Sequence, residues 1–250
     1  MAYETIAVEK RGHIAEVRLN RPDRGNPIDA RFLDELDAAA ASIHDDPEVY
    51  VVLLTAAGDV FSSGRLAEPE MMARHDRLPF RALELMGQPV VAAIEGDAIG
   101  AGLELALACD MRVASEEAMF AIPDVEMGMA PSGGATARLP RIAGRGLAAE
   151  LILLGARIDG RRAAASGLVN EALPRPAVRA RAEAVAQSMA AQGPLALRYA
   201  KEAMLRGLDM PLDQALRFET DLTVILQTTA DRAEGVRAFL EKRSPRFEGK

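Results

Sequence analysis

The sequence predicts an α/β fold of layered short strands and helices, followed by a region of helices alone. Two observations lead to this prediction. Before residue 175, two kinds of segment alternate along the chain. Short strand-like segments, which are apolar or alternate between apolar and polar residues and are bounded by turn residues, are followed by segments of helical periodicity. From Arg175 onward only helical patterns occur, with breaks at Gly193-Pro194 and near Asp209-Met210-Pro211, and no strand is expected there for these helices to cover.

The individual elements follow from periodicity and from turn and cap residues. The segments that flank Arg11-Gly12-His13 alternate between apolar and polar residues, which is typical of a hairpin, and Asp29 can cap the helix that follows. The expected strands are 5–10, 14–19, 49–55, 90–94, 111–114, 119–122 and 168–172. The expected helices are 30–44, 80–86, one that begins near 101, 135–143, 147–154, 160–166, 177–191, 195–206, 212–227 and 232–242.

Composition and charge exclude several classes of function. The 250 residues carry a formal net charge of -7, and no run of Lys or Arg is long enough for a nucleic-acid or membrane-surface site. The single cysteine, Cys109, and three scattered histidines offer no disulfide framework and no metal-ligand spacing. We therefore expect no metal, no nucleic-acid partner and no membrane partner. The start of the chain has no pattern of a secretory signal or presequence, so a cytoplasmic protein is expected.

The stretch from Val90 to Asp110 contains the first candidate for chemistry. A short buried strand is followed by a glycine-rich turn and then by an apolar helix that begins near Ala101. Glu104 is the one charged side chain of this helix, and its neighbours are Leu and Ala, so it is expected to be buried. A buried carboxylate is costly unless it is paired or functional, which makes Glu104 a candidate catalytic group.

Three loops hold further candidates, although each alone is typical of an ordinary turn. Asp124 follows Pro123 in a loop that comes after the strand at 119–122. The segment F-S-S-G-R at 61–65 follows a strand, and its backbone N–H groups can face a ligand oxygen. The segment P-S-G-G at 131–134 precedes a helix and allows close approach of a substrate or phosphate.

Together these features predict one site. Backbone N–H groups near Gly64-Arg65 and Gly100-Ala101-Gly102 can converge to form an oxyanion hole. The carboxylates of Glu104 and Asp124 would then stand over the same substrate atom. Such an arrangement is suited to proton transfer on a carbonyl compound.

The chain resembles the enoyl-CoA hydratase/isomerase (crotonase) family in five segments: N-R-P-D-R-G-N-P-I, F-S-S-G-R, P-V-V-A-A-I-E-G-D-A-I-G-A-G-L-E-L-A-L-A-C-D, F-A-I-P-D-V-E-M-G-M-A-P-S-G-G-A-T-A-R-L and E-G-V-R-A-F-L-E-K-R-S-P-R-F. The resemblance implies a spiral of ββα turns with the acyl-CoA site over residues 1–192. It also implies a helical trimerisation region over residues 193–250, so that the chain forms a homotrimer or a dimer of trimers. No cofactor is implied, because coenzyme A is part of the substrate.

By this resemblance, the backbone N–H groups of Arg65 and Ala101 form the oxyanion hole, and Glu104 and Asp124 occupy the positions of the two hydratase glutamates. Asp124 is one methylene shorter than a glutamate, and Arg65 is bulky for a position often held by Ala or Gly. Leu66 replaces an acidic residue of the family. The residues expected to bind the substrate are Arg24, Ser63, Gly64, Leu66, Gly100, Pro131 and Gly133.

The function implied by this resemblance is hydration of a 2-enoyl-CoA. A Δ3-Δ2 enoyl-CoA isomerase is an alternative, since one carboxylate suffices to move a proton between C2 and C4, and other acyl-CoA reactions of the family are further alternatives. A protein that binds acyl-CoA without catalysing a reaction is a less favoured alternative. The sequence leaves the acyl group open.

Overall fold

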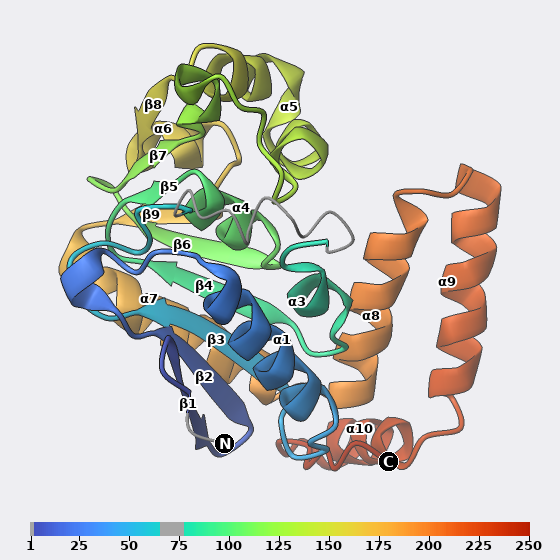
Figure 1. Cartoon of the computed structure of the whole chain (residues 1–250). Coiled ribbons are helices and arrows are strands. Elements are labelled where there is room, and N and C mark those ends of the chain that lie inside the picture. Colours follow the sequence, from blue (N-terminus) through green and yellow to red (C-terminus); the bar gives the residue numbers. More distant parts are fainter. Residues whose placement is uncertain (1–2, 66–77) are drawn as a thin grey trace.

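The computed structural model describes residues 3–65 and 78–250 and has an α/β architecture with two sheets (Figure 1). The larger sheet has six strands in the order β1-β2-β3-β4-β6-β9. β1 and β2 pair antiparallel, as the predicted hairpin requires, and every later pair is parallel. The six strands are Ile6–Arg11 (β1), Ile14–Leu19 (β2), Val51–Ala56 (β3), Val90–Ile94 (β4), Met111–Ser115 (β6) and Glu171–Leu173 (β9).

The smaller sheet has three strands in the order β5-β7-β8. β5 runs parallel to β7, and β7 runs antiparallel to β8. The strands are Ala98–Ile99 (β5), Met119–Ala121 (β7) and Arg157–Asp159 (β8). The sequence analysis missed β5 and β8, because two or three residues are too few to display an alternating pattern.

Helices connect the strands and cover the sheets. The predicted cap of the first helix is confirmed, since the Asp29 side chain accepts a hydrogen bond from the Phe32 backbone N–H. The helices are α1 (Ala30–His44), α3 (Arg81–Leu85), α4 (Ala101–Leu107), α5 (Ala135–Leu153), α6 (Gly160–Ala165), α7 (Arg175–Ala190), α8 (Pro194–Gly207), α9 (Leu212–Leu226) and α10 (Ala230–Glu241), with the 3-10 helices η1 (Pro22–Arg24) and η2 (Pro123–Met127).

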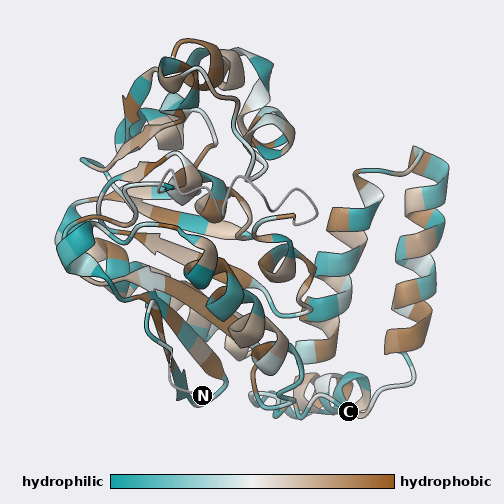
Figure 2. Cartoon of the chain, viewed as in Figure 1, coloured by the Kyte–Doolittle hydropathy of each residue, from teal (hydrophilic) through white to brown (hydrophobic). Residues whose placement is uncertain are grey.

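The hydrophobic core lies on both faces of the larger sheet, because successive strand residues point to opposite faces. On β3, Val52 and Leu54 face the main core, whereas Val51 and Leu53 face α7. The central strands β3 and β4 are accordingly hydrophobic along most of their length (Figure 2). Strands buried on both faces read as continuous apolar runs, and this is the pattern that the sequence shows at 90–94.

One expectation about the C-terminal helices is wrong. α7 packs on β3, β4 and β6, so this helix does have strands to cover. Its buried face is a narrow stripe formed by Val178, Ala182 and Ala186, spaced four residues apart. A stripe composed mainly of alanines between arginines gives a weak apolar signal, which explains why the sequence did not reveal it.

Two further elements can be compared with the expectations. The two helices predicted at 135–143 and 147–154 are both present within α5, because the chain breaks helical geometry between them at Gly144, where φ is 79°. The strand predicted at 168–172 begins later, at Glu171. Leu168 and Val169 are buried, but their backbone N–H groups bond to the Ala163 carbonyl and close the end of α6 instead of joining the sheet.

α8 and α9 pack side by side, and α10 lies near their ends (Figure 1). Lys201 anchors α8 to the body of the protein, since its buried Nζ donates to Asp110 Oδ2 at 2.7 Å. Large apolar side chains of these three helices, and of Leu208 directly after α8, are exposed in the single chain: Met204, Leu208, Leu212, Leu216, Val224, Ile225, Val236, Phe239 and Leu240. Among the described residues, no helix combines the length and apolarity needed to cross a bilayer.

Candidate active site

Glu104 lies within α4 at the centre of the molecule. The chain passes from β4 through the short strand β5 to Gly100, whose positive φ of 51° begins α4. Every residue of α4 is buried, and Glu104 is only 1% exposed. The predicted burial of this carboxylate is therefore confirmed.

Backbone groups of the loop before α5 hold the Glu104 carboxylate. Its Oε1 accepts hydrogen bonds from the Gly133 N–H at 2.7 Å and the Ala135 N–H at 3.1 Å. Burial raises the pKa of Glu104, and the two N–H donors and the Arg65 guanidinium oppose that increase. Oε2 accepts no hydrogen bond from the described residues, so this oxygen is available for a substrate or a water molecule.

Gly133 must be a glycine for the carboxylate to keep this position. A Cβ atom at residue 133 would lie 2.4 Å from Glu104 Oε2 and 3.0 Å from the Phe80 ring. Arg138 fixes the same peptide, because its Nη1 donates to the Gly133 carbonyl at 2.9 Å while its Nε and Nη2 bind Glu84. The loop therefore presents a rigid backbone to Glu104.

Asp124 approaches the same region from η2. Its Oδ2 lies 3.8 Å from the position of a Cβ built on Gly100, which places the carboxylate at the start of α4. The side chain is half-buried, and burial raises its pKa against the effects of its own backbone N–H and of Arg65. The Asp124 charge in turn raises the pKa of Glu104, as expected for two neighbouring carboxylates.

Two backbone N–H groups lie near these carboxylates. A Cβ built on Gly64 would lie 2.9 Å from the Ile99 carbonyl oxygen and 3.8 Å from the Ala101 nitrogen, so the two chain segments are in close contact. Gly64 has a φ of 102°, which favours glycine. Within the described part of the chain, the N–H groups of Arg65 and Ala101 donate no hydrogen bond. Both remain free for a substrate oxygen.

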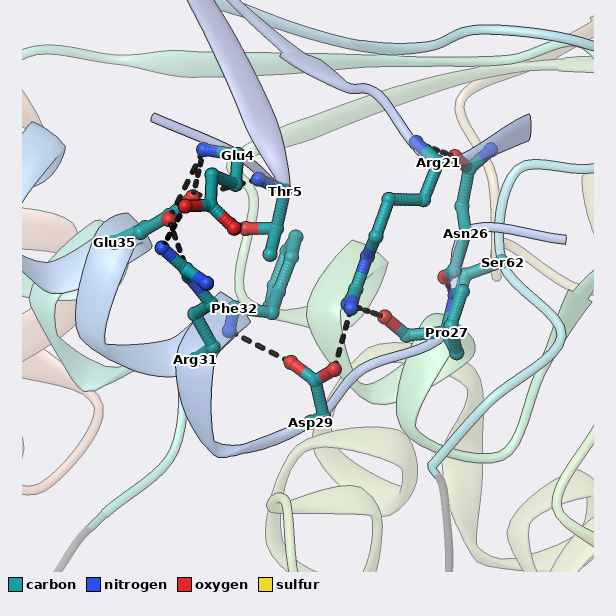
Figure 3. A network of polar contacts seen from close by, with 10 residues as sticks. All are labelled: Glu4, Thr5, Arg21, Asn26, Pro27, Asp29, Arg31, Phe32, Glu35 and Ser62. Atoms are coloured by element: carbon teal, nitrogen blue, oxygen red, sulfur yellow. Dashed lines mark hydrogen bonds and ion pairs between the residues drawn. The ribbon is translucent and has the colours of Figure 1, made fainter. Parts of the chain in front are cut away.

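A polar network supports the segment that carries Arg65 (Figure 3). Asn26 donates through Nδ2 to the Val60 carbonyl at 2.8 Å, and the Ser62 hydroxyl donates to the Asn26 carbonyl at 2.9 Å. Arg21 binds both Asp29 and the Pro27 carbonyl. These contacts fix the loop at 20–29 against residues 60–62 and so hold the neighbouring Arg65 backbone in place.

The Arg65 side chain also enters the site. Its Nη1 donates to the Ser132 hydroxyl, and its charge opposes the increase that burial causes in the pKa of both Glu104 and Asp124. Its Nε and Nη2 atoms are buried without a hydrogen-bond partner. The guanidinium therefore lies close to both carboxylates.

The structure brings most of the predicted site residues together. Pro131 and Gly133 are buried in the loop beside Glu104, and Gly100 lies near the Asp124 carboxylate. Ser63 donates through its N–H to the Gly25 carbonyl at 2.8 Å, and the neighbouring Arg24 is exposed. Leu66 lies outside the described residues.

Sequence reasoning missed the residues that support the catalytic candidates. The Ala135 N–H donor, the Arg138–Glu84 pair and the contact between Ser132 and Arg65 join segments far apart in the chain. The P-S-G-G segment was the only signal for any of them. Among the described residues, no group of three or more His, Cys, Asp or Glu side chains could hold a metal ion.

An α/β fold with two sheets and C-terminal helices, a buried glutamate behind a glycine turn and a pair of free amides define a protein of the crotonase class. The chain belongs to the enoyl-CoA hydratase/isomerase family, whose model matches residues 9–250. A relative from Syntrophomonas wolfei, named crotonyl-CoA hydratase, is 35% identical over 99% of this chain and 99% of its own length. An Escherichia coli relative, named 2,3-dehydroadipyl-CoA hydratase, is 35% identical over 98% of this chain and 99% of its own length.

The fold is shared with solved structures at high similarity. A crystal structure of an enoyl-CoA hydratase from Bacillus anthracis superposes with a TM-score of 0.94 and 36% sequence identity. The match covers 99% of this chain and 100% of that one. The predicted crotonase fold, with C-terminal helices after the sheets, is therefore confirmed.

Proposed function

We propose that this protein is an enoyl-CoA hydratase, which adds water across the 2,3 double bond of an enoyl-CoA thioester. The observation that carries the proposal is the convergence of Glu104 and Asp124 on the free N–H groups of Arg65 and Ala101. The hydratase names of the relatives from S. wolfei and E. coli support the same reaction. Their names refer to different acyl groups, so the likeness leaves the acyl group open.

In the proposed mechanism, the thioester oxygen accepts hydrogen bonds from the Arg65 and Ala101 N–H groups. These donors stabilise the negative charge that develops on the oxygen as water adds to C3. Glu104, whose ionised form is favoured by two amide donors, accepts a proton from the attacking water. The protonated Asp124 carboxyl delivers a proton to C2, so that the product gains a hydroxyl at C3 and a hydrogen at C2. The proton taken up by Glu104 then replaces the one that Asp124 gave up, and the site returns to its starting state.

Asp124 makes a second reaction worth testing. Its side chain is shorter than the glutamate of the family, and its carboxylate rests against Gly100 on the α4 side of the site. If that carboxylate does not reach the water, Glu104 alone could still move a proton between C2 and C4. A Δ3-Δ2 enoyl-CoA isomerase is therefore the second candidate.

The C-terminal helices belong to the same proposal. We assign residues 1–192 to the core that holds the acyl-CoA site and residues 193–250 to a helical region that forms a homotrimer or a dimer of trimers. The exposed apolar side chains of α8, α9 and α10 support this assignment, because a surface of this kind is typical of a subunit interface. Sedimentation of the purified chain tests it, and a monomer at micromolar concentration would contradict it.

Product analysis separates the two candidate reactions. We would incubate the protein with crotonyl-CoA and, separately, with 3-hexenoyl-CoA in heavy water, and identify each product by mass. A hydratase converts crotonyl-CoA to a 3-hydroxy ester that carries the mass of one water. An isomerase converts only the 3-enoyl ester, without gain of water, and that result would replace the hydratase assignment.

A further inference from the structure

The guanidinium of Arg65 has an unusual set of contacts for a group inside an acyl-CoA site. Nη1 donates to the Ser132 hydroxyl, whereas Nε and Nη2 are buried and have no partner. In Arg18, Arg21 and Arg198, the other arginines of the described chain with such a donor, Nε is the one nitrogen that is both buried and without a partner. Buried donors without acceptors are rare in folded proteins, and each such case needs an explanation.

The two free donors lie on one edge of the guanidinium. In arginine, the Nε–H and one Nη2–H bond point in the same direction within the guanidinium plane, so together they form a fork with two parallel donors. This fork matches the two oxygens of a carboxylate, which it binds through a pair of charge-assisted hydrogen bonds. The vacant edge of Arg65 thus has the geometry of a carboxylate site.

The protein's own carboxylates do not fill this edge. The Arg65 charge affects the pKa of both Glu104 and Asp124. The ion pairs of the described residues nevertheless include none between Arg65 and either carboxylate. Glu104 Oε1 already accepts two backbone donors, and its α4 position is fixed by the surrounding core. Within residues 3–65 and 78–250 the Arg65 edge therefore has no acceptor, and a bound ligand can supply one.

The position of Arg65 indicates what that acceptor belongs to. Its backbone N–H is one of the two proposed donors to the thioester oxygen, and its side chain crosses from there to Ser132, one residue before Gly133. The guanidinium consequently lies beside the path that the acyl group takes past Glu104 and Asp124.

We propose that Arg65 binds a second carboxylate on the acyl group, so that the preferred substrates are CoA monothioesters of dicarboxylic acids. This inference rests on the proposed function, because it assumes that the acyl group lies at Glu104. The guanidinium also separates the incoming carboxylate from Glu104 and Asp124, which would otherwise repel it. A neutral acyl group leaves the Arg65 edge without an acceptor, which disfavours such substrates.

Binding of unreactive, saturated esters tests this inference without any need for turnover. We would measure the affinities of succinyl-, glutaryl- and adipyl-CoA and of their neutral counterparts, butyryl-, pentanoyl- and hexanoyl-CoA, by calorimetry on the full chain. At least one diacid ester should bind tenfold or more tightly than the neutral ester of equal length. Equal binding within each of the three pairs would overturn the inference.

Variants of Arg65 identify the source of that preference. Arg65→Met should remove the preference for the diacid ester over the neutral ester of equal length, because methionine has no pair of parallel donors. Arg65→Lys keeps the charge but not the fork, and it should restore only a small part of the preference. Arg161→Met, which changes an exposed arginine paired with Glu116, is the matched control and should leave the preference intact.

A phosphate of coenzyme A is the other anion that this edge could bind. In that case Arg65→Met would weaken diacid and neutral CoA esters by the same factor, and the loss would disappear with pantetheine thioesters, which lack the phosphates. That pattern would also overturn the inference. Hydration of crotonyl-CoA without any diacid preference would refute the inference alone, whereas an Arg65-dependent preference without hydration would refute only the proposed function.

Discussion

Replacing Gly133 with alanine tests whether the loop before α5 sets the position of Glu104. The new Cβ would lie 2.4 Å from Glu104 Oε2 and 2.7 Å from its carboxyl carbon. To reach ordinary contact at 3.4 Å, the carboxylate and the loop must separate by about 1 Å. The same movement stretches the 2.7 Å hydrogen bond from the Gly133 N–H beyond hydrogen-bond range.

The expected loss follows from that displacement. A shift of about 1 Å in a catalytic group can reduce the rate by about 100-fold, which corresponds to about 2.7 kcal/mol of activation free energy. The overpacked contact with Glu104 and Phe80 should also lower the free energy of unfolding by about 1–3 kcal/mol. Gly133→Ala should therefore remain folded at 25 °C while it loses most of its activity.

Initial rates with crotonyl-CoA and urea unfolding measure the two effects. Gly146→Ala is the matched control, since a Cβ at Gly146 would meet nothing within 4 Å and the glycine is exposed on α5. This control should keep wild-type kcat/KM and change the free energy of unfolding by less than about 1 kcal/mol. If Gly133→Ala had the same kcat/KM as Gly146→Ala, the positional role of the loop would be refuted.

Three further predictions concern pH and stability. Burial raises the pKa of the Glu104 carboxyl, so kcat/KM for crotonyl-CoA should fall on the acid side at a pH above the ordinary glutamate pKa of about 4.3. Arg65→Met removes an opposing charge and should move this fall to a still higher pH. A pH-rate profile in which Arg65→Met moves the fall to a lower pH would contradict this prediction. Burial alone would raise the pKa of Glu35, but hydrogen bonds from Thr5, Glu4 and Arg31 lower it to about 2 (Figure 3). This stabilisation is present above the unfolded-state pKa and is lost as the pH falls toward 2. Glu35→Gln should therefore lower the free energy of unfolding in urea by about 2 kcal/mol at pH 7, and by progressively less below about pH 4.5. An equal loss at pH 7 and at pH 3 would count against this prediction. Lys201→Met should cost about 3–5 kcal/mol, because it leaves the Asp110 carboxylate without its buried partner, and restoration of stability by the added change Asp110→Asn is the check on this cause.

Local chemistry explains which parts of the fold the sequence revealed. α1 begins where Asp29 caps it, and β4 coincides with the predicted apolar run, because a cap and a short periodic segment depend only on neighbouring residues. The burial of Glu104 was also predictable, since its helix is apolar on every side. By contrast, α7 covers the sheet through a stripe of small residues that has little apolar contrast.

The site was predictable in its residue types and much less so in its geometry. The two carboxylates and the glycine turns can be recognised in the sequence from their residue types and their neighbours. The donors to Glu104 come from residues 133 and 135, and the vacant edge of Arg65 depends on a hydroxyl 67 positions later in the chain. Contacts of this kind arise from the tertiary fold, and no local period or spacing encodes them.

The measurement that tests the account most directly is the rate of crotonyl-CoA hydration in wild type, Glu104→Gln and Asp124→Asn, with the product identified by mass. Glutamine at 104 can still accept the N–H groups of Gly133 and Ala135, so this variant should fold normally while it loses the proton acceptor. The account predicts a product heavier by one water in wild type and a loss of about 100-fold or more in each variant. Turnover at the wild-type rate in folded Glu104→Gln would contradict it.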